Sequence, residues 1–200
     1  MNLPNKLTVF RMILVPIFIV IGYVGIPGNM LGISTTFWVM NLIFIVAAIT
    51  DKLDGSIARK QNLVTNFGKF LDPIADKILV ISALVMLVEF EKIPAWIPII
   101  VIAREFLVSG YRLIAVQASG NVIAANIWGK LKTTTQMIAI VLTLADKYRF
   151  FDFVSKAGTM GIGYLIVNIL ASVLMAISVI ATIFSGWSYL KGGKDLLKDA

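Results

Sequence analysis

Cysteine and histidine are both absent from this chain of 200 residues, and charged residues make up only 14% of it. Without cysteine the protein has no disulfides and no thiolate nucleophile, and without histidine it has no imidazole for acid–base chemistry. Zinc sites built from these two residue types are also excluded. Any general base must therefore be a carboxylate, a lysine or a tyrosine.

Hydrophobic residues make up 58% of the chain and the mean hydropathy is +0.90, which is typical of an integral membrane protein. Apolar segments recur over residues 8–25, 35–59, 68–88, 94–117, 122–145 and 158–190. Each is near the ~20 residues that span a bilayer as a helix. We predict an all-α membrane protein with six transmembrane helices in one domain over residues 1–200. The first segment lacks the features of a cleaved signal and should be retained.

The basic residues predict the topology. When the six segments alternate across the membrane, thirteen of the eighteen lysines and arginines fall on one side, four on the other, and Arg104 falls mid-span. The positive-inside rule then places both termini in the cytoplasm. The net charge of +7 is consistent with attraction to anionic headgroups. Because these residues are scattered among apolar segments, we expect no nucleic-acid partner.

Four aspartates within 26 positions stand out in a chain with eleven acidic residues: Asp51, Asp54, Asp72 and Asp76. The apolar run before the first pair, residues 37–50, covers only about 21 Å as a helix, less than the membrane core. The helix must therefore continue past Asp54. The same reasoning puts the second pair at membrane depth, where carboxylates line a wet cavity or bind a cation.

The spacing lets the four carboxylates converge. Asp51 and Asp54 are i,i+3 on one helix, and Gly68, Asp72 and Asp76 are i,i+4 on the next, so each set forms one stripe. Converging carboxylates require compensating cations. Oxygen ligands favour Mg²⁺ or Mn²⁺, and four carboxylates suffice for two ions. Gly55 and Gly68 indicate close approach of a phosphate or nucleotide to the backbone. The alternative is a pair of polar helix faces with no ligand.

The motif Asp51-x-x-Asp54-Gly55-x-x-Ala58-Arg59, followed eight residues later by Gly68-x-x-x-Asp72-x-x-x-Asp76, resembles the signature of the CDP-alcohol phosphotransferases. All eight fixed positions match. The resemblance implies six transmembrane helices, a homodimer and a metal site that opens to the cytoplasm. It also implies displacement of CMP from a CDP-linked lipid or alcohol by a hydroxyl acceptor.

Three further stretches, residues 2–11, 103–112 and 129–136, are most similar to bacterial members of this family that act in phospholipid biosynthesis at the cell membrane. That similarity implies CDP-diacylglycerol as the donor and sn-glycerol 3-phosphate as the acceptor. Tyr111, where a leucine is expected, is a mild departure.

The resemblance also implies roles for individual residues. The four aspartates would hold two divalent cations, and Asp76 would in addition accept the proton of the attacking hydroxyl. The expected CDP-lipid site comprises Asn5, Thr8, Gly55, Ala58, Arg59, Thr65 and Gly68.

A phosphorylated acceptor calls for arginine and lysine. Arg112 and Lys130 are the first candidates, followed by Arg11 and Lys132. For the two lysines the alternative is snorkelling to the lipid headgroups. Arg104 and Glu105 lie mid-helix, where a buried ion pair or an interhelical hydrogen bond is expected.

Other readings remain open at this point. An enzyme of the same family could use inositol phosphate, serine or a phosphatidylglycerol lipid as its acceptor. The basic candidates argue against free serine but do not separate glycerol 3-phosphate from inositol phosphate. A divalent-cation transporter is the alternative from another class, although the chain lacks the internal repeats typical of transporters.

Overall fold

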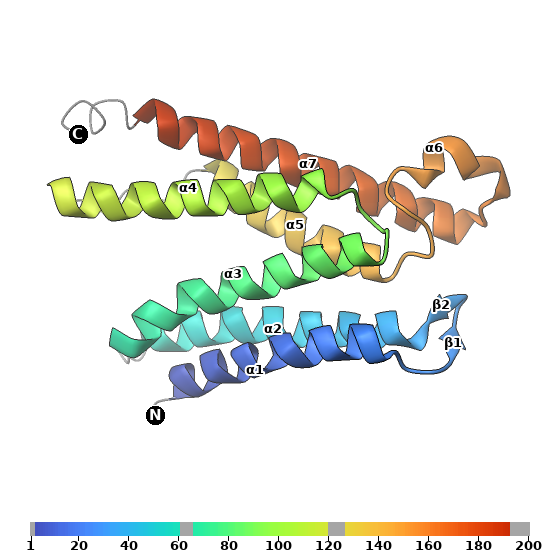
Figure 1. Cartoon of the computed structure of the whole chain (residues 1–200), viewed down its shortest axis with the longest axis horizontal. Helices are drawn as coiled ribbons and strands as arrows, with labels where there is room; N and C mark the ends of the chain where they lie inside the picture. The colour runs from blue at the N-terminus through green and yellow to red at the C-terminus, as the bar shows by residue number, and fades with distance from the viewer. Residues whose placement is uncertain (1–2, 61–65, 120–126, 193–200) are drawn as a thin grey trace.

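The described part of this computed structural model comprises the backbone of residues 3–60, 66–119 and 127–192 and the side chains of residues 5–51, 71, 74–111 and 127–191. Within it, six long helices match the six predicted apolar segments (Figure 1). They are α1 (Leu3–Val24), α2 (Thr35–Lys60), α3 (Asn66–Glu89), α4 (Trp96–Ser119), α5 (Ile127–Leu144) and α7 (Ile162–Gly192). The all-α prediction is confirmed.

The helices form two groups, which α2 and α3 join. Helix α1 packs along α2 and α3, α7 packs along α5 and α4, α2 contacts α5, and α3 contacts α4 and α5. The fully buried side chains Phe18, Phe44, Leu87 and Ile140 belong to the shared core. Gly22 permits the close approach of α1 to α3, because a Cβ there would lie 2.4 Å from the Met86 methyl group.

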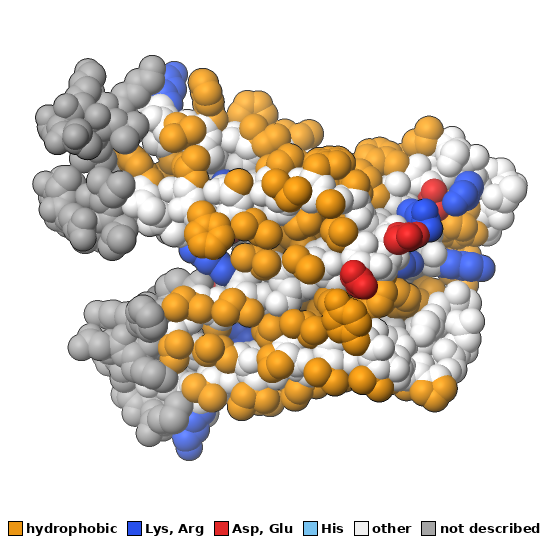
Figure 2. Space-filling view, in the orientation of Figure 1, with side chains coloured by type: hydrophobic (Ala, Val, Ile, Leu, Met, Phe, Trp, Pro, Cys, Tyr) orange, Lys and Arg blue, Asp and Glu red, His pale blue; other side chains and the backbone are white. Residues whose placement is uncertain are grey.

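The outer surface of the bundle is apolar, and its largest helix has polar residues on the inner face. On α7 the buried positions include Ser178, Thr182 and Ser185, whereas Ile180, Ile183 and other large hydrophobic residues are exposed. Orange side chains accordingly cover much of the visible surface (Figure 2). Small polar residues between helices and apolar residues outside are typical of membrane proteins. By length and hydropathy, segments of α1 (Asn5–Val24) and α7 (Ile162–Lys191) could each cross a membrane.

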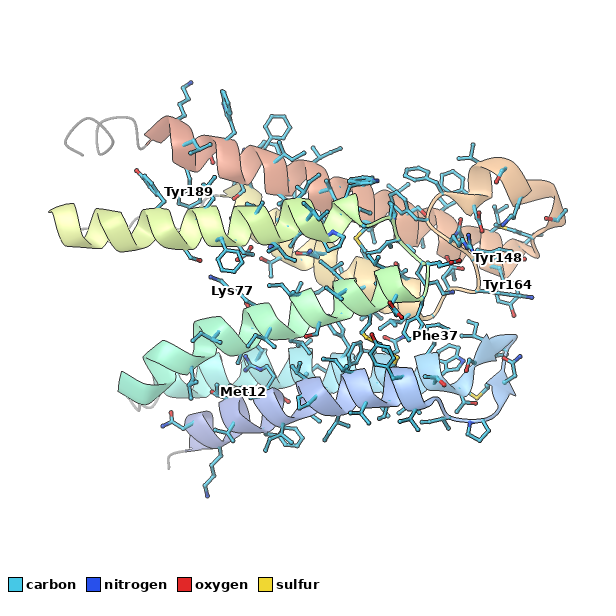
Figure 3. The ribbon with its side chains drawn as sticks, in the orientation of Figure 1. Met12, Phe37, Lys77, Tyr148, Tyr164 and Tyr189 are labelled. Atoms are coloured by element: carbon cyan, nitrogen blue, oxygen red, sulfur yellow. The ribbon has the colours of Figure 1, made fainter. Side chains whose placement is uncertain are left out.

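Short elements gather at the end of the bundle opposite the start of α1 and the end of α7 (Figure 1). Strands β1 (Asn29–Met30) and β2 (Ile33–Ser34) form an antiparallel hairpin, and α6 (Asp152–Lys156) and the 3₁₀ helix η1 (Ala157–Thr159) precede α7. Leu31 and Gly32 turn the hairpin, both with positive φ. The hairpin contacts α7, since Tyr164, labelled in Figure 3, donates its hydroxyl hydrogen to the carbonyl of Leu31 at 2.5 Å.

A buried hydrogen-bond network ties these connections to the helices, and we call this region the closed end. The Asn168 amide donates to Asp146 Oδ2 at 2.6 Å and to the Arg149 carbonyl at 2.9 Å, and it accepts from the Phe153 N–H at 2.8 Å. Lys92 donates to the Asp146 carbonyl at 2.5 Å. Burial raises the pKa of the Asp146 carboxyl and lowers the pKa of the Lys92 ammonium.

Candidate functional site

The first part of the site joins α1 to α2. Asn5, Thr8 and Arg11 follow one another at three-residue spacing on the buried side of α1. The Arg11 side chain is fully buried, and its Nη1 lies 2.5 Å from Oδ1 of Asp51 on α2. A buried guanidinium needs a partner of opposite charge, which Asp51 supplies.

The second part is a cavity of about 280 Å³ between α3, α4, α5 and α7, which we call the polar cavity. Basic side chains are visible in a hollow between the two helix groups (Figure 2). The ionisable and amide groups that line the cavity are Asp76, Lys77, Arg104, Glu105, Lys132, Gln136 and Tyr189. Such a mixture of cations and carboxylates inside an apolar helix bundle is characteristic of a functional site.

Glu105 organises the cations of the polar cavity. Its Oε1 accepts from Arg104 at 2.8 Å and from Lys132 on α5 at 2.5 Å. Arg104 also donates to the Ser185 hydroxyl of α7 at 2.5 Å, so three helices are linked through one ion-pair cluster. Lys77 points from α3 toward α4 (Figure 3), where its ammonium donates to the Ser109 hydroxyl. The expected ion pair between Arg104 and Glu105 is confirmed.

The two parts of the site meet at Asp76. The Asp76 carboxyl is within electrostatic range of Asp51 and Arg11 on one side and of Lys132 and Glu105 on the other. It also lines the polar cavity directly. Asp76, the last aspartate of the acidic motif, therefore lies between Asp51 and the cations of the polar cavity that could bind an anion.

The structure separates the predicted acceptor residues. Lys132 is buried, with 6% of its surface exposed, and lines the polar cavity, which excludes snorkelling for this residue. Lys130 is exposed and is not part of the cavity wall, as expected of a lysine that reaches toward headgroups. Arg11 is paired with Asp51.

Other predicted residues fall where side chains are not described: Asp54, Gly55, Ala58, Arg59, Gly68, Asp72 and Arg112. Thr65 lies outside the described backbone as well. Among the described residues no group of three potential metal ligands occurs.

Sequence reasoning did not assign Lys77, Glu105 or Gln136 to a ligand site. Their signal was present, since all three are polar residues within apolar helical segments. The contacts between helices that bring them together could not be read from spacing alone.

The CDP-alcohol phosphatidyltransferase family profile matches residues 1–184. The chain belongs to this family. It is 41% identical to the CDP-diacylglycerol–glycerol-3-phosphate 3-phosphatidyltransferase of Bacillus subtilis, covering 98% of this chain and 97% of the relative. It is 38% identical to the protein of the same name from Haemophilus influenzae, covering 99% and 96%. A probable phosphatidylglycerophosphate synthase of Mycobacterium tuberculosis is 34% identical over 94% of this chain and 80% of the relative.

Membership of the CDP-alcohol phosphatidyltransferase family makes the chain a transferase, so the transporter alternative is set aside. The family uses divalent cations. The described donors fit such ions, because Asp51 already attracts the buried guanidinium of Arg11 and lies near a second carboxylate, Asp76. On α2, Asp54 follows Asp51 by about one helical turn. On α3, Asp72 precedes Asp76 by about one turn.

Proposed function

We propose that the protein transfers the phosphatidyl group of CDP-diacylglycerol to sn-glycerol 3-phosphate, releasing CMP and forming phosphatidylglycerophosphate. The observation that carries this proposal is the position of Asp76, which lines one cavity together with Arg104 and Lys132. A base and cations suited to a phosphorylated alcohol therefore share one space. The names of the relatives support the same donor and acceptor.

The acceptor phosphate binds near Lys132 and Arg104 in this proposal. Both cations are held in place by Glu105 before any ligand arrives. Arginine offers paired donors and lysine a compact charge, and together they suit a phosphate dianion. Arg112, Lys130 and Arg11 remain predictions for this site, and we expect smaller contributions from Lys130 and Arg11 because they lie outside the cavity wall.

Asp76 acts as the general base. The 1-hydroxyl of glycerol 3-phosphate is a poor nucleophile until a neighbouring carboxylate accepts its proton. The oxygen then forms a bond to the β-phosphorus of the CDP-lipid, and the bond from that phosphorus to the CMP oxygen breaks. CMP leaves with the bonding electron pair, and the proton remains on Asp76.

The acidic motif would hold the divalent cations through Asp51, Asp54, Asp72 and Asp76. Two ions, Mg²⁺ or Mn²⁺, would neutralise the pyrophosphate oxygens and stabilise the CMP leaving group. The residues proposed for the CDP-lipid are Asn5, Thr8, Gly55, Ala58, Arg59, Thr65 and Gly68. Asn5 and Thr8 lie about two turns and one turn before Arg11, and their buried polar side chains support this assignment.

The proposal is tested by CMP release from CDP-diacylglycerol with purified protein and a panel of acceptors. Glycerol 3-phosphate should support release, whereas inositol phosphate, serine and phosphatidylglycerol should support little. Release should stop when the divalent cation is chelated and return with Mg²⁺ or Mn²⁺. Faster release with inositol phosphate would make inositol phosphate, rather than glycerol 3-phosphate, the acceptor. No release with any acceptor would overturn the proposal.

We further propose six membrane spans in the bacterial cell membrane, the inner or plasma membrane, with both termini and the polar cavity on the cytoplasmic side. The exposed apolar surfaces of α1 and α7 support this arrangement. Since the chain lacks cysteine, single cysteines report topology cleanly. A membrane-impermeant maleimide should label Lys147→Cys on spheroplasts, but Lys6→Cys only after lysis. The reverse pattern would invert the topology.

The family resemblance also supports a homodimer. Mass measurement of the protein in lipid nanodiscs distinguishes a dimer from a monomer directly. A monomer with full CMP release would remove the dimer from the proposal.

A further inference from the structure

Gln136 places an unsatisfied amide in the wall of the polar cavity. Only 2% of its surface is exposed, and among the described residues no hydrogen-bond partner lies within reach of its Nε2. The residue lines the cavity together with Asp76 and Lys132. A buried donor without a partner is costly, and sites of this kind are often completed by a ligand atom.

Other buried polar residues of α5 near Gln136 have hydrogen-bond partners. The hydroxyl of Thr135, the preceding residue, is buried but donates to the Leu131 carbonyl of its own helix at 2.8 Å. Thr143, two turns further along α5, does the same with Ala139 at 2.7 Å. Gln136 is therefore distinguished from the other buried polar residues on this helix by facing the cavity without such a bond.

The chemistry of the cavity indicates which ligand atom would meet this amide. Lys132 and Arg104 are cations and suit the phosphate of the acceptor. Gln136 is neutral and lies one turn beyond Lys132 on α5, which is about 6 Å along the helix axis. That displacement fits the carbon chain of a short phosphorylated polyol, whose hydroxyl groups are the atoms that a neutral amide suits.

We propose that Gln136 is a specificity-determining residue that donates a hydrogen bond from Nε2 to the 2-hydroxyl of the acceptor. This inference rests on the proposed function, in which the adjacent 1-hydroxyl is directed to Asp76. The bond orients the three-carbon chain between the cations and the base. It also disfavours acceptors that lack the second hydroxyl, because they leave the buried donor unpaired.

The test pairs two enzymes with two acceptors. Gln136→Met keeps the side-chain volume but removes the amide, and 3-hydroxypropyl phosphate keeps the attacking hydroxyl and the phosphate but lacks the 2-hydroxyl. We expect kcat/KM of Gln136→Met to fall about tenfold with glycerol 3-phosphate. With 3-hydroxypropyl phosphate it should change by less than about twofold, so the preference of the wild type for the natural acceptor is lost.

Thr135→Val is the matched control, since it removes a buried hydroxyl that bonds only within its own helix. It should retain the preference of the wild type between the two acceptors. Equal losses with both acceptors in Gln136→Met, or no loss with either, would overturn the assignment of Gln136 while leaving the proposed function intact. Failure of the wild type to release CMP with glycerol 3-phosphate would overturn the proposed function, and this inference with it.

Discussion

The closed end and the polar cavity differ in whether their buried polar groups have hydrogen-bond partners. At the closed end, Asn168 bonds to three groups and joins α7 to the connection before it. In the cavity, Nε2 of Gln136 and Nε of Arg104 have no partner within the part of the chain that the structure describes. A fully hydrogen-bonded network stabilises a fold, whereas buried donors without partners are available to bind a ligand. Changes at the two ends should therefore separate stability from catalysis.

The largest effect on this comparison is expected from Asp76→Asn. Turnover should fall by about 100-fold or more, because amide nitrogen and oxygen cannot accept the hydroxyl proton as a carboxylate does. CDP-lipid binding and the unfolding temperature should stay close to those of the wild type. The measurement is single-turnover CMP release beside a lipid-binding assay, and near-normal turnover would remove Asp76 from the mechanism.

Asn168→Ala should produce the largest effect at the closed end. The change deletes three hydrogen bonds and leaves Asp146 Oδ2 and the Phe153 N–H without their partner. We expect a loss of about 2 kcal/mol in unfolding free energy, measured by thermal unfolding in detergent. At a temperature where the variant is folded, kcat/KM should stay within about twofold of the wild type. A large loss of catalysis there would show that the two ends are coupled.

Lys132→Met sharpens the assignment within the cavity, with Lys130→Met as its matched control two residues away. Loss of the buried Lys132 ammonium should raise KM for glycerol 3-phosphate about tenfold, while KM for the CDP-lipid changes little. The exposed lysine should change either constant by less than about threefold. A larger effect at Lys130 would move the acceptor site toward the membrane surface.

Glu91→Gln should have the smallest effect. Glu91 pairs with Arg149 at the closed end, but both side chains are more than half exposed. Exposed ion pairs contribute less than about 1 kcal/mol because water screens them. The unfolding temperature should hardly change, in contrast to Asn168→Ala a short distance away, and a comparable loss would mean that the surface pair belongs to the network.

The helices were well predicted because each mostly apolar segment is near the length of a membrane-spanning helix, even where single polar residues interrupt it. All six predicted segments became helices, and the prediction that the helix carrying Asp51 continues past Asp54 is confirmed by α2, which ends at Lys60. The β1–β2 hairpin, α6 and η1 were missed, since such short elements depend on turns and on contacts such as that of Tyr164 with Leu31.

The candidate site was predictable only in part. The motif identified the family and its aspartates, because their spacing on two neighbouring helices is a local property. The partners of Lys132 and Arg11 could not be predicted, because both side chains pair with residues on other helices. Charge alone could not distinguish the buried Lys132 from the exposed Lys130, since helix rotation decides which of them faces inward.

In the proposed function, the acceptor phosphate must compete with Glu105 for Lys132. An entering anion finds the Lys132 ammonium already engaged by a carboxylate at 2.5 Å, and must attract it more strongly than that carboxylate does. A doubly charged phosphate can do so, whereas an uncharged alcohol such as free glycerol cannot. In the proposed function, Glu105 would therefore favour a phosphorylated acceptor over an uncharged alcohol, and Lys132 would pair with Glu105 again after the product leaves.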